Sequence, residues 1–139
     1  MQTDFMDAHD RHWEDAENLF QARRWANADH LYGLAAECGM KQLMLAFGMK
    51  YDISKDLPDD PDDRKHVNSL WERFESYRSG QPQGAGYALT ATNPFADWDV
   101  KQRYANQSHF NQAHVAAHQT GAKVVYDLIQ LARREGLLT

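Results

Sequence analysis

The segment WANADHLYGLAAECGMKQLMLAFG, residues 25–48, gives the strongest indication of the fold in this sequence. Apolar side chains recur there at steps of three and four residues, between Ala28 and Phe47, which is the period of an α-helix. Further apolar residues widen this stripe to most of the circumference: Leu34, Ala36, Met40, Met44 and Leu45. A helix that is apolar on most sides must be covered on most sides. The segment is therefore predicted to be the central helix of a helical bundle.

Two charged residues, Glu37 and Lys41, interrupt this apolar segment. They are four residues apart, with the acid on the N-terminal side, which is the favourable order for a pair on one helix turn. We expect an ion pair within the helix.

Three other segments show a helical period. The first runs from a cap at Thr3 or Asp4 to Arg23 or Arg24, and a short joint then predicts an antiparallel hairpin with the central helix. A third helix is predicted from Pro61 to Ser79, and a last one from a cap at Asn106 or Ser108 to Glu135. The predicted fold is an all-α, up-and-down bundle of four main helices plus short helical turns, forming a single domain over residues 1–139.

The connections differ in composition. Residues 49–60 carry proline and aspartate and predict a loop with a solvated, helix-capping acidic turn, since a calcium loop would need glycine and glutamate at set positions. Residues 80–96 are rich in Gly, Pro, Ala and Thr and predict a long, mobile connection. A short helical turn is expected over residues 97–100.

Net charge, cysteine content and the lack of long apolar runs limit the classes of function that this chain can have. The formal net charge of −5 argues against a protein that coats nucleic acid through bulk charge, although it leaves room for a small local RNA site. The single cysteine, Cys38, excludes an internal disulfide. The N-terminus is acidic and no apolar run approaches membrane-spanning length, so we expect a cytoplasmic protein without a membrane segment.

The central segment resembles the second helix of HEPN domains, in which a run of the form ANAxxLxGxAxExxxK packs in the middle of an α-helical bundle. Residues 26–41 follow that pattern. The segments KHVNSLWERF (residues 65–74) and WDVKQRY (residues 98–104) resemble later parts of the same family, so that the resemblance covers nearly the whole chain.

The resemblance implies a function. Members of the family are small helical bundles that usually dimerise, and many are metal-independent endoribonucleases of toxin–antitoxin, CRISPR-linked or other defence systems. Others are non-catalytic binding modules that partner a nucleotidyltransferase. Active members carry an Arg, four to six residues, and a His near the start of the last helix. Arg103 and His109 match that spacing, with Tyr104 where the family often has Asn, Asp or His.

The two matched residues suit RNA cleavage by the RNA's own 2′-hydroxyl. Histidine titrates near neutral pH and suits a general base, which is the role expected of His109. The guanidinium of Arg103 suits charge on the phosphate. Tyr104 and Asn106 are expected to form the base of the site and to bind the substrate, with residues 80–96 as its rim. Trp98 has two interpretations, stacking on an RNA base or packing in the core. We expect a homodimer whose last helix contributes to the interface.

A third interpretation is a metal-binding bundle. His114 and His118 are four residues apart on the last predicted helix, which is metal-ligand spacing, and His9, His12 or Glu37 would complete the set. No Glu-x-x-His pair occurs in the sequence. The sequence therefore favours a protein without a metal or other cofactor, with an RNA substrate and an antitoxin or nucleotidyltransferase as the expected partners.

Overall fold

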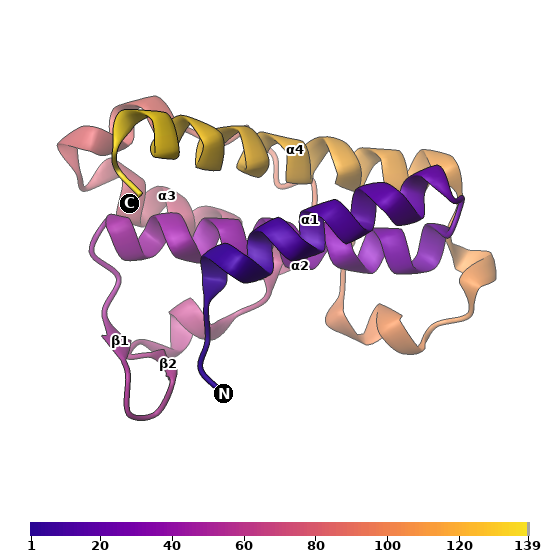
Figure 1. The fold of residues 1–139 in the computed structure, drawn as a ribbon, viewed down its shortest axis with the longest axis horizontal. Coiled ribbons are helices and arrows are strands. Elements are labelled where there is room, and N and C mark those ends of the chain that lie inside the picture. Colours follow the sequence, from indigo (N-terminus) through magenta and orange to yellow (C-terminus); the bar gives the residue numbers. More distant parts are fainter. Residues whose placement is uncertain (139) are drawn as a thin grey trace.

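A computed structural model describes residues 1–138 and consists of an all-α bundle, as predicted (Figure 1). Its main helices are α1 (Phe5–Gln21), α2 (Trp25–Ala46), α3 (Trp71–Ser79) and α4 (Gln112–Glu135). A short antiparallel pair, β1 (Tyr51–Asp52) with β2 (Leu57–Pro58), closes the loop after α2. Five 3₁₀ turns complete the described part: η1 (Pro61–Arg64), η2 (Val67–Ser69), η3 (Pro82–Tyr87), η4 (Val100–Tyr104) and η5 (Gln107–His109).

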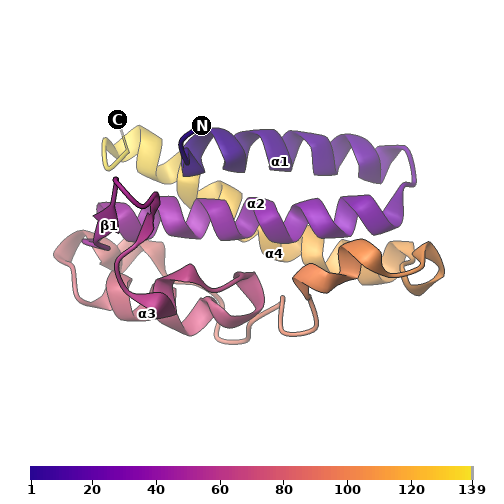
Figure 2. The ribbon, with the colours of Figure 1, turned by 90° about the horizontal axis from the view of Figure 1, so that it is seen from below.

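The helix α2 is central, as its apolar pattern predicts. It runs beside α1 in a hairpin, with α4 packed along it and with α3 and η4 on its remaining side (Figure 2). Ala28, Tyr32, Ala36, Met40 and Leu43 are fully buried. Three charged residues of the same helix are also buried, and they are Asp29, Glu37 and Lys41. Because a buried charge is costly unless it is paired, these three residues mark where polar partners must gather.

The third helix begins later than predicted. Asp60 caps only the short turn η1, with its Oδ1 accepting from the Asp62 N–H at 2.9 Å. Lys65 and His66 are then extended, and α3 starts at Trp71. The chain leaves the helical conformation there because Glu37 on α2 accepts a hydrogen bond from the Val67 N–H at 3.0 Å. This contact places His66 against α2.

The last helix also begins later than predicted, at Gln112 rather than after Asn106 or Ser108. Asn106 caps only the turn η5, through a bond from the Ser108 N–H at 2.9 Å, and Asn111 caps α4 through the His114 N–H at 2.9 Å. Phe110, between the two caps, is buried. The extended backbone that delivers this ring to the core separates η5 from α4.

Residues 80–96 are anchored rather than loose. Tyr87 and Phe95 are buried, and the Tyr87 hydroxyl donates to Glu135 at 2.7 Å near the end of α4. These contacts hold the segment to the bundle in this structure, and its role as a mobile rim stays a prediction. Across residues 1–138, no helix combines the length and the apolar character that a membrane crossing needs.

Candidate functional site

Arg103 and His109 lie on different turns, η4 and η5, before α4 begins. Both are exposed, and η4 and η5 follow one another along the same side of α2 (Figure 2). The Arg103 Nη1 donates to the Val100 carbonyl at 3.2 Å. Within residues 1–138, no side-chain hydrogen bond or ion pair joins His109 to Arg103 or to any other side chain. The matched spacing therefore does not bring the two groups into contact within one chain.

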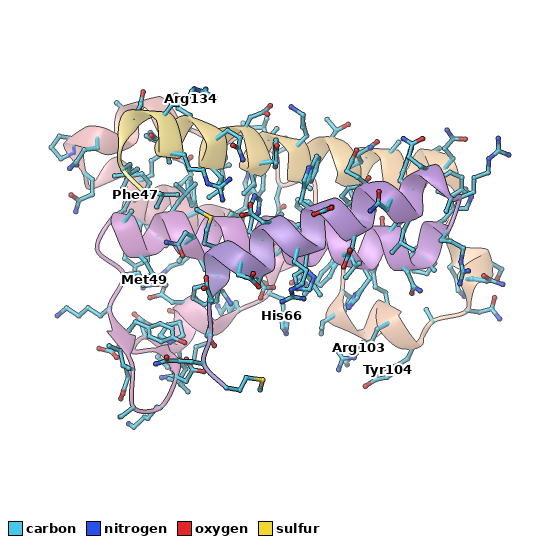
Figure 3. All side chains as sticks on the ribbon, in the orientation of Figure 1. Phe47, Met49, His66, Arg103, Tyr104 and Arg134 are labelled. Atoms are coloured by element: carbon cyan, nitrogen blue, oxygen red, sulfur yellow. The ribbon has the colours of Figure 1, made fainter. Side chains whose placement is uncertain are left out.

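Tyr104 is an exposed aromatic residue beside Arg103. Its side chain is 78% exposed, and the Arg103 guanidinium carbon lies 4.7 Å from the ring centroid. Figure 3 shows both side chains projecting outward on the same side of α2 as His66. Asn106 is also exposed and is used as the cap of η5. Arg103 and Tyr104 thus form a cationic and aromatic surface that is open to solvent.

Trp98 packs in the core, which confirms the packing interpretation, and stacking on an RNA base does not fit this conformation. The indole is 1% exposed and its N–H donates to the Asp29 carbonyl at 3.1 Å. The His30 imidazole stacks on it at 5.6 Å between centroids, and His66 lies against it at 6.5 Å. The indole therefore positions two imidazoles and offers no free face.

Glu37 is the centre of a first polar cluster, the Glu37 cluster, which consists of Glu37, Lys41 and His66. One Glu37 oxygen accepts from Lys41 Nζ at 3.2 Å, which confirms the expected ion pair. The other oxygen is 3.0 Å from His66 Nδ1. The side chains of Glu37 and Lys41 are 11% and 7% exposed, whereas that of His66 is 47% exposed. A buried carboxylate thus orients an imidazole that reaches solvent.

The two acid–base groups of the Glu37 cluster shift in opposite directions. Burial alone would raise the pKa of Glu37, but the His66 hydrogen bond and the Lys41 charge outweigh it and hold the pKa below its usual value. The hydrogen bond to Glu37 raises the pKa of His66 above its ordinary 6.5, against opposing effects of burial and of the charges on Lys41 and Arg103. His66 is therefore protonated over a wider pH range than a free histidine.

Two further histidines lie near this cluster. His30 is half-buried, and its Nδ1 is buried with no hydrogen-bond partner among residues 1–138. Burial lowers the pKa of His30, followed by the charge of Arg103. Burial likewise lowers the pKa of His12 on α1. The Glu37 cluster is thus bordered by imidazoles and by one exposed guanidinium.

Asp29 is the centre of a second polar cluster, the Asp29 cluster, which consists of Asp29, Asp97, Gln102, His114 and His118. His118 Nδ1 lies 2.5 Å from Asp29 Oδ1, and its Nε2 lies 2.8 Å from Asp97 Oδ1. Gln102 Nε2 donates to Asp29 Oδ2 at 2.6 Å. Burial would lower the pKa of His118, but the hydrogen bonds and charges of the two carboxylates raise it. The cluster joins α2 to α4, to η4 through Gln102 and to the chain before η4 through Asp97.

The predicted metal ligands are only partly brought together. His114 and His118 do share a site, and their third neighbour is Asp29. His9 lies elsewhere, with its Nδ1 2.7 Å from the Ala35 carbonyl. Asp29, Asp97 and His66 were missed because each meets partners that are far away in the sequence. A usable signal for Asp29 was its place on the apolar stripe of the central helix.

Comparisons leave the family open. Neither models of protein families, nor curated proteins, nor solved structures match this chain. The HEPN resemblance therefore rests on the sequence pattern of residues 26–41 and the spacing of Arg103 and His109.

A titration of His66 tests whether Arg103 acts on this imidazole. Replacing Arg103 with Gln should raise the pKa of His66 further, because a nearby positive charge that disfavours the imidazolium is removed. Glu37, Lys41 and His30 are the other titratable groups that face His66, and they are unchanged. The measurement is an NMR titration of the His66 ring protons. Lys123→Gln, on α4, is the control and should leave this pKa in place, and an equal shift in both variants would contradict the assignment.

Proposed function

We propose that this chain is a HEPN-like domain that cleaves RNA without a metal ion, within a toxin–antitoxin or other defence system. Arg103 stabilises charge on the phosphate, and His66, held by Glu37, transfers a proton. The proposal is supported by the half-exposed His66 imidazole on a buried carboxylate, which lies on the same side of α2 as the exposed Arg103 (Figure 3). A carboxylate-oriented histidine is a recurrent acid–base arrangement.

The reaction needs two proton transfers. The 2′-oxygen attacks phosphorus as its proton leaves to a base, and the bond from phosphorus to the 5′-oxygen breaks as that oxygen gains a proton. His66 Nδ1 is engaged by Glu37, and its raised pKa suits donation from Nε2 to the departing 5′-oxygen. The products are a 2′,3′-cyclic phosphate and a 5′-hydroxyl. The base role that the resemblance assigns to His109 requires a second copy of the chain, as in the expected homodimer.

The surface around Arg103 suits single-stranded RNA. Tyr104 is an exposed ring on which a base can stack, and the adjacent guanidinium suits a phosphate. Two more cationic residues, Arg23 and Arg24, lie close to η4 and η5. They line one pocket together with Ala105, Gln107 and residues at the start of α2. A local basic surface is what RNA binding needs in a chain whose net charge is −5.

The test compares matched histidine variants on single-stranded RNA in the presence of EDTA. His66→Asn and Arg103→Gln should each slow cleavage by about a hundredfold or more, since each removes a group that acts in the transition state. His109→Asn should slow cleavage to a similar extent, because the base role needs this histidine from a second copy of the chain. Circular dichroism checks that all variants fold.

Two results would contradict the proposal. A large loss in His109→Asn with none in His66→Asn would return the catalytic role to the histidine of the sequence motif. An absence of cleavage by the unaltered chain at any concentration would favour the other HEPN-like function, a non-catalytic binding module that partners a nucleotidyltransferase or an antitoxin.

A further inference from the structure

The Asp29 cluster brings three metal-ligating side chains to one point between α2 and α4. One ligand atom from each of Asp29, His114 and His118 lies within 4.8 Å of the other two. We propose that these three residues bind a divalent transition-metal ion, for which Zn²⁺ is the probe. This inference is independent of RNA cleavage and concerns a different set of side chains.

The distances around Asp29 are close to those of a metal site. His118 Nδ1 is 2.5 Å from Asp29 Oδ1, and His114 Nε2 is 3.9 Å from Asp29 Oδ2. Zinc bonds to nitrogen and carboxylate oxygen are about 2.0–2.2 Å long, so neighbouring ligands of a tetrahedral ion stand roughly 3.4 Å apart. The two histidines face different oxygens of Asp29, so the contact to Oδ1 must lengthen by about 1 Å and the contact to Oδ2 must shorten by about 0.5 Å to reach that spacing.

Asp97 lies where a carboxylate can orient a metal-bound histidine. A metal-bound histidine usually donates its other ring N–H to a carboxylate, which fixes the tautomer and the ring orientation. Both histidines direct their other nitrogen at Asp97. His118 Nε2 is 2.8 Å from Asp97 Oδ1, and His114 Nδ1 is 3.9 Å from Asp97 Oδ2. Asp97 therefore hydrogen-bonds His118 and lies close to His114, at a distance longer than a hydrogen bond.

The Asp29 carboxylate is buried and fixed in position, which suits it to bind a cation. Its side chain is fully buried, and Gln102 Nε2 donates to the oxygen that faces His114. A buried carboxylate needs compensating charge, and a divalent ion would balance Asp29 and Asp97 together while both imidazoles are neutral. Without an ion, His118 joins the two carboxylates through its contacts with Asp29 and Asp97.

The donor set indicates the class of metal. Two imidazoles and one carboxylate suit zinc and the neighbouring first-row metals, whereas calcium and magnesium prefer oxygen ligands alone. The side chains of His114 and Asp97 are 32% and 65% exposed, so an ion can enter from their side and keep a water as its fourth ligand. Three protein ligands with an open position are typical of a reactive rather than a purely structural zinc site.

The experiment titrates chelator-stripped full-length protein with Zn²⁺ by calorimetry, without RNA. We expect one equivalent to bind, and a melting temperature that rises by about 5 °C or more at a hundredfold excess over Kd. Co²⁺ in place of Zn²⁺ should give d–d absorption bands of a low-coordinate ion. His114→Ala is the main variant, because this side chain is partly exposed and its loss leaves the Asp29–His118–Asp97 contacts intact.

The Zn²⁺ affinities of the variants distinguish histidines that bind the metal from histidines that do not. His114→Ala should weaken Zn²⁺ binding by about a hundredfold or more, and Asp97→Asn by about 10–100-fold, because the Asp97 carboxylate orients His118. His109→Ala, which removes an exposed histidine, should bind Zn²⁺ like the unaltered chain. No binding by the folded wild type, or equal losses in His114→Ala and His109→Ala, would overturn the proposal. Because the readout is metal binding alone, a failure of RNA cleavage has no bearing on it.

Discussion

Replacing Glu37 with Gln is expected to lower the free energy of unfolding by about 3–5 kcal/mol. The amide keeps an oxygen for the Val67 N–H, whose bond to Glu37 is 3.0 Å long, so the turn η2 retains its cap. What is lost is the negative charge beside Lys41, whose side chain is 7% exposed and whose Nζ lies 3.2 Å from Glu37. A buried ammonium without its carboxylate is costly, and that cost dominates the change.

A double-mutant cycle separates charge from shape. Lys41→Met in the Glu37→Gln background removes the uncompensated ammonium while it keeps an unbranched apolar chain of similar length. The double variant should therefore be more stable than Glu37→Gln alone, by about 1 kcal/mol or more in urea-melt experiments. Asp127→Asn, which breaks the exposed Lys123–Asp127 pair of α4, should shift the midpoint little. Equal losses in Glu37→Gln and in the double variant would show that the buried ion pair is not the source.

The pair of Glu37 with His66 adds a pH dependence. Because the folded state raises the pKa of His66, the stability from that pair is fully present below the unfolded value near 6.5 and is lost as pH rises through the folded value. Glu37 has the opposite sign, since its pKa is depressed, and its contribution is lost as pH falls through the folded value. Together, the two groups stabilise the fold most at pH values between the folded-state pKa of Glu37 and the folded-state pKa of His66.

The fold was predictable wherever the period of apolar residues decided it. The central helix was predicted over residues 25–48 and spans Trp25–Ala46. Helix starts were harder, because Asn106, Ser108 and Asn111 are all capable caps and local chemistry does not rank them. The choice is made by tertiary contacts, since Phe110 must reach the core before α4 begins.

The candidate sites were predictable only in part for the same reason. The ion pair of Glu37 with Lys41 lies within one helix, so sequence spacing was sufficient. Asp29 and His118 are separated by 89 residues, and Glu37 and His66 by 29, so no local pattern could join them. The remaining clue was physical. A charged residue on the apolar face of a central helix is costly to bury without a partner, and Asp29 has no oppositely charged residue one turn away in the sequence.

Replacing Gly33 with Ala is expected to destabilise the fold by about 3 kcal/mol or more, although alanine normally stabilises a helix interior by about 1 kcal/mol relative to glycine. A Cβ at this position would lie 2.1 Å from Trp98 Cε2 and 2.2 Å from Trp98 Nε1. The indole is rigid and buried, so it has little freedom to move aside. Displacing it would also break its 3.1 Å hydrogen bond to the Asp29 carbonyl.

Two comparisons make the origin of this loss testable by thermal melts. Gly86→Ala is the control, because a Cβ there meets nothing within 4 Å, and its melting temperature should be close to that of the unaltered chain. Trp98→Phe removes the indole edge that meets the new methyl group, so Gly33→Ala should cost less in the Trp98→Phe background than in the unaltered chain. Additive losses would mean that the clash is relieved elsewhere. Asp97 and Gln102, which flank Trp98 in the sequence, belong to the Asp29 cluster. A displaced indole would therefore disturb the cluster, so Gly33→Ala should also weaken Zn²⁺ binding there.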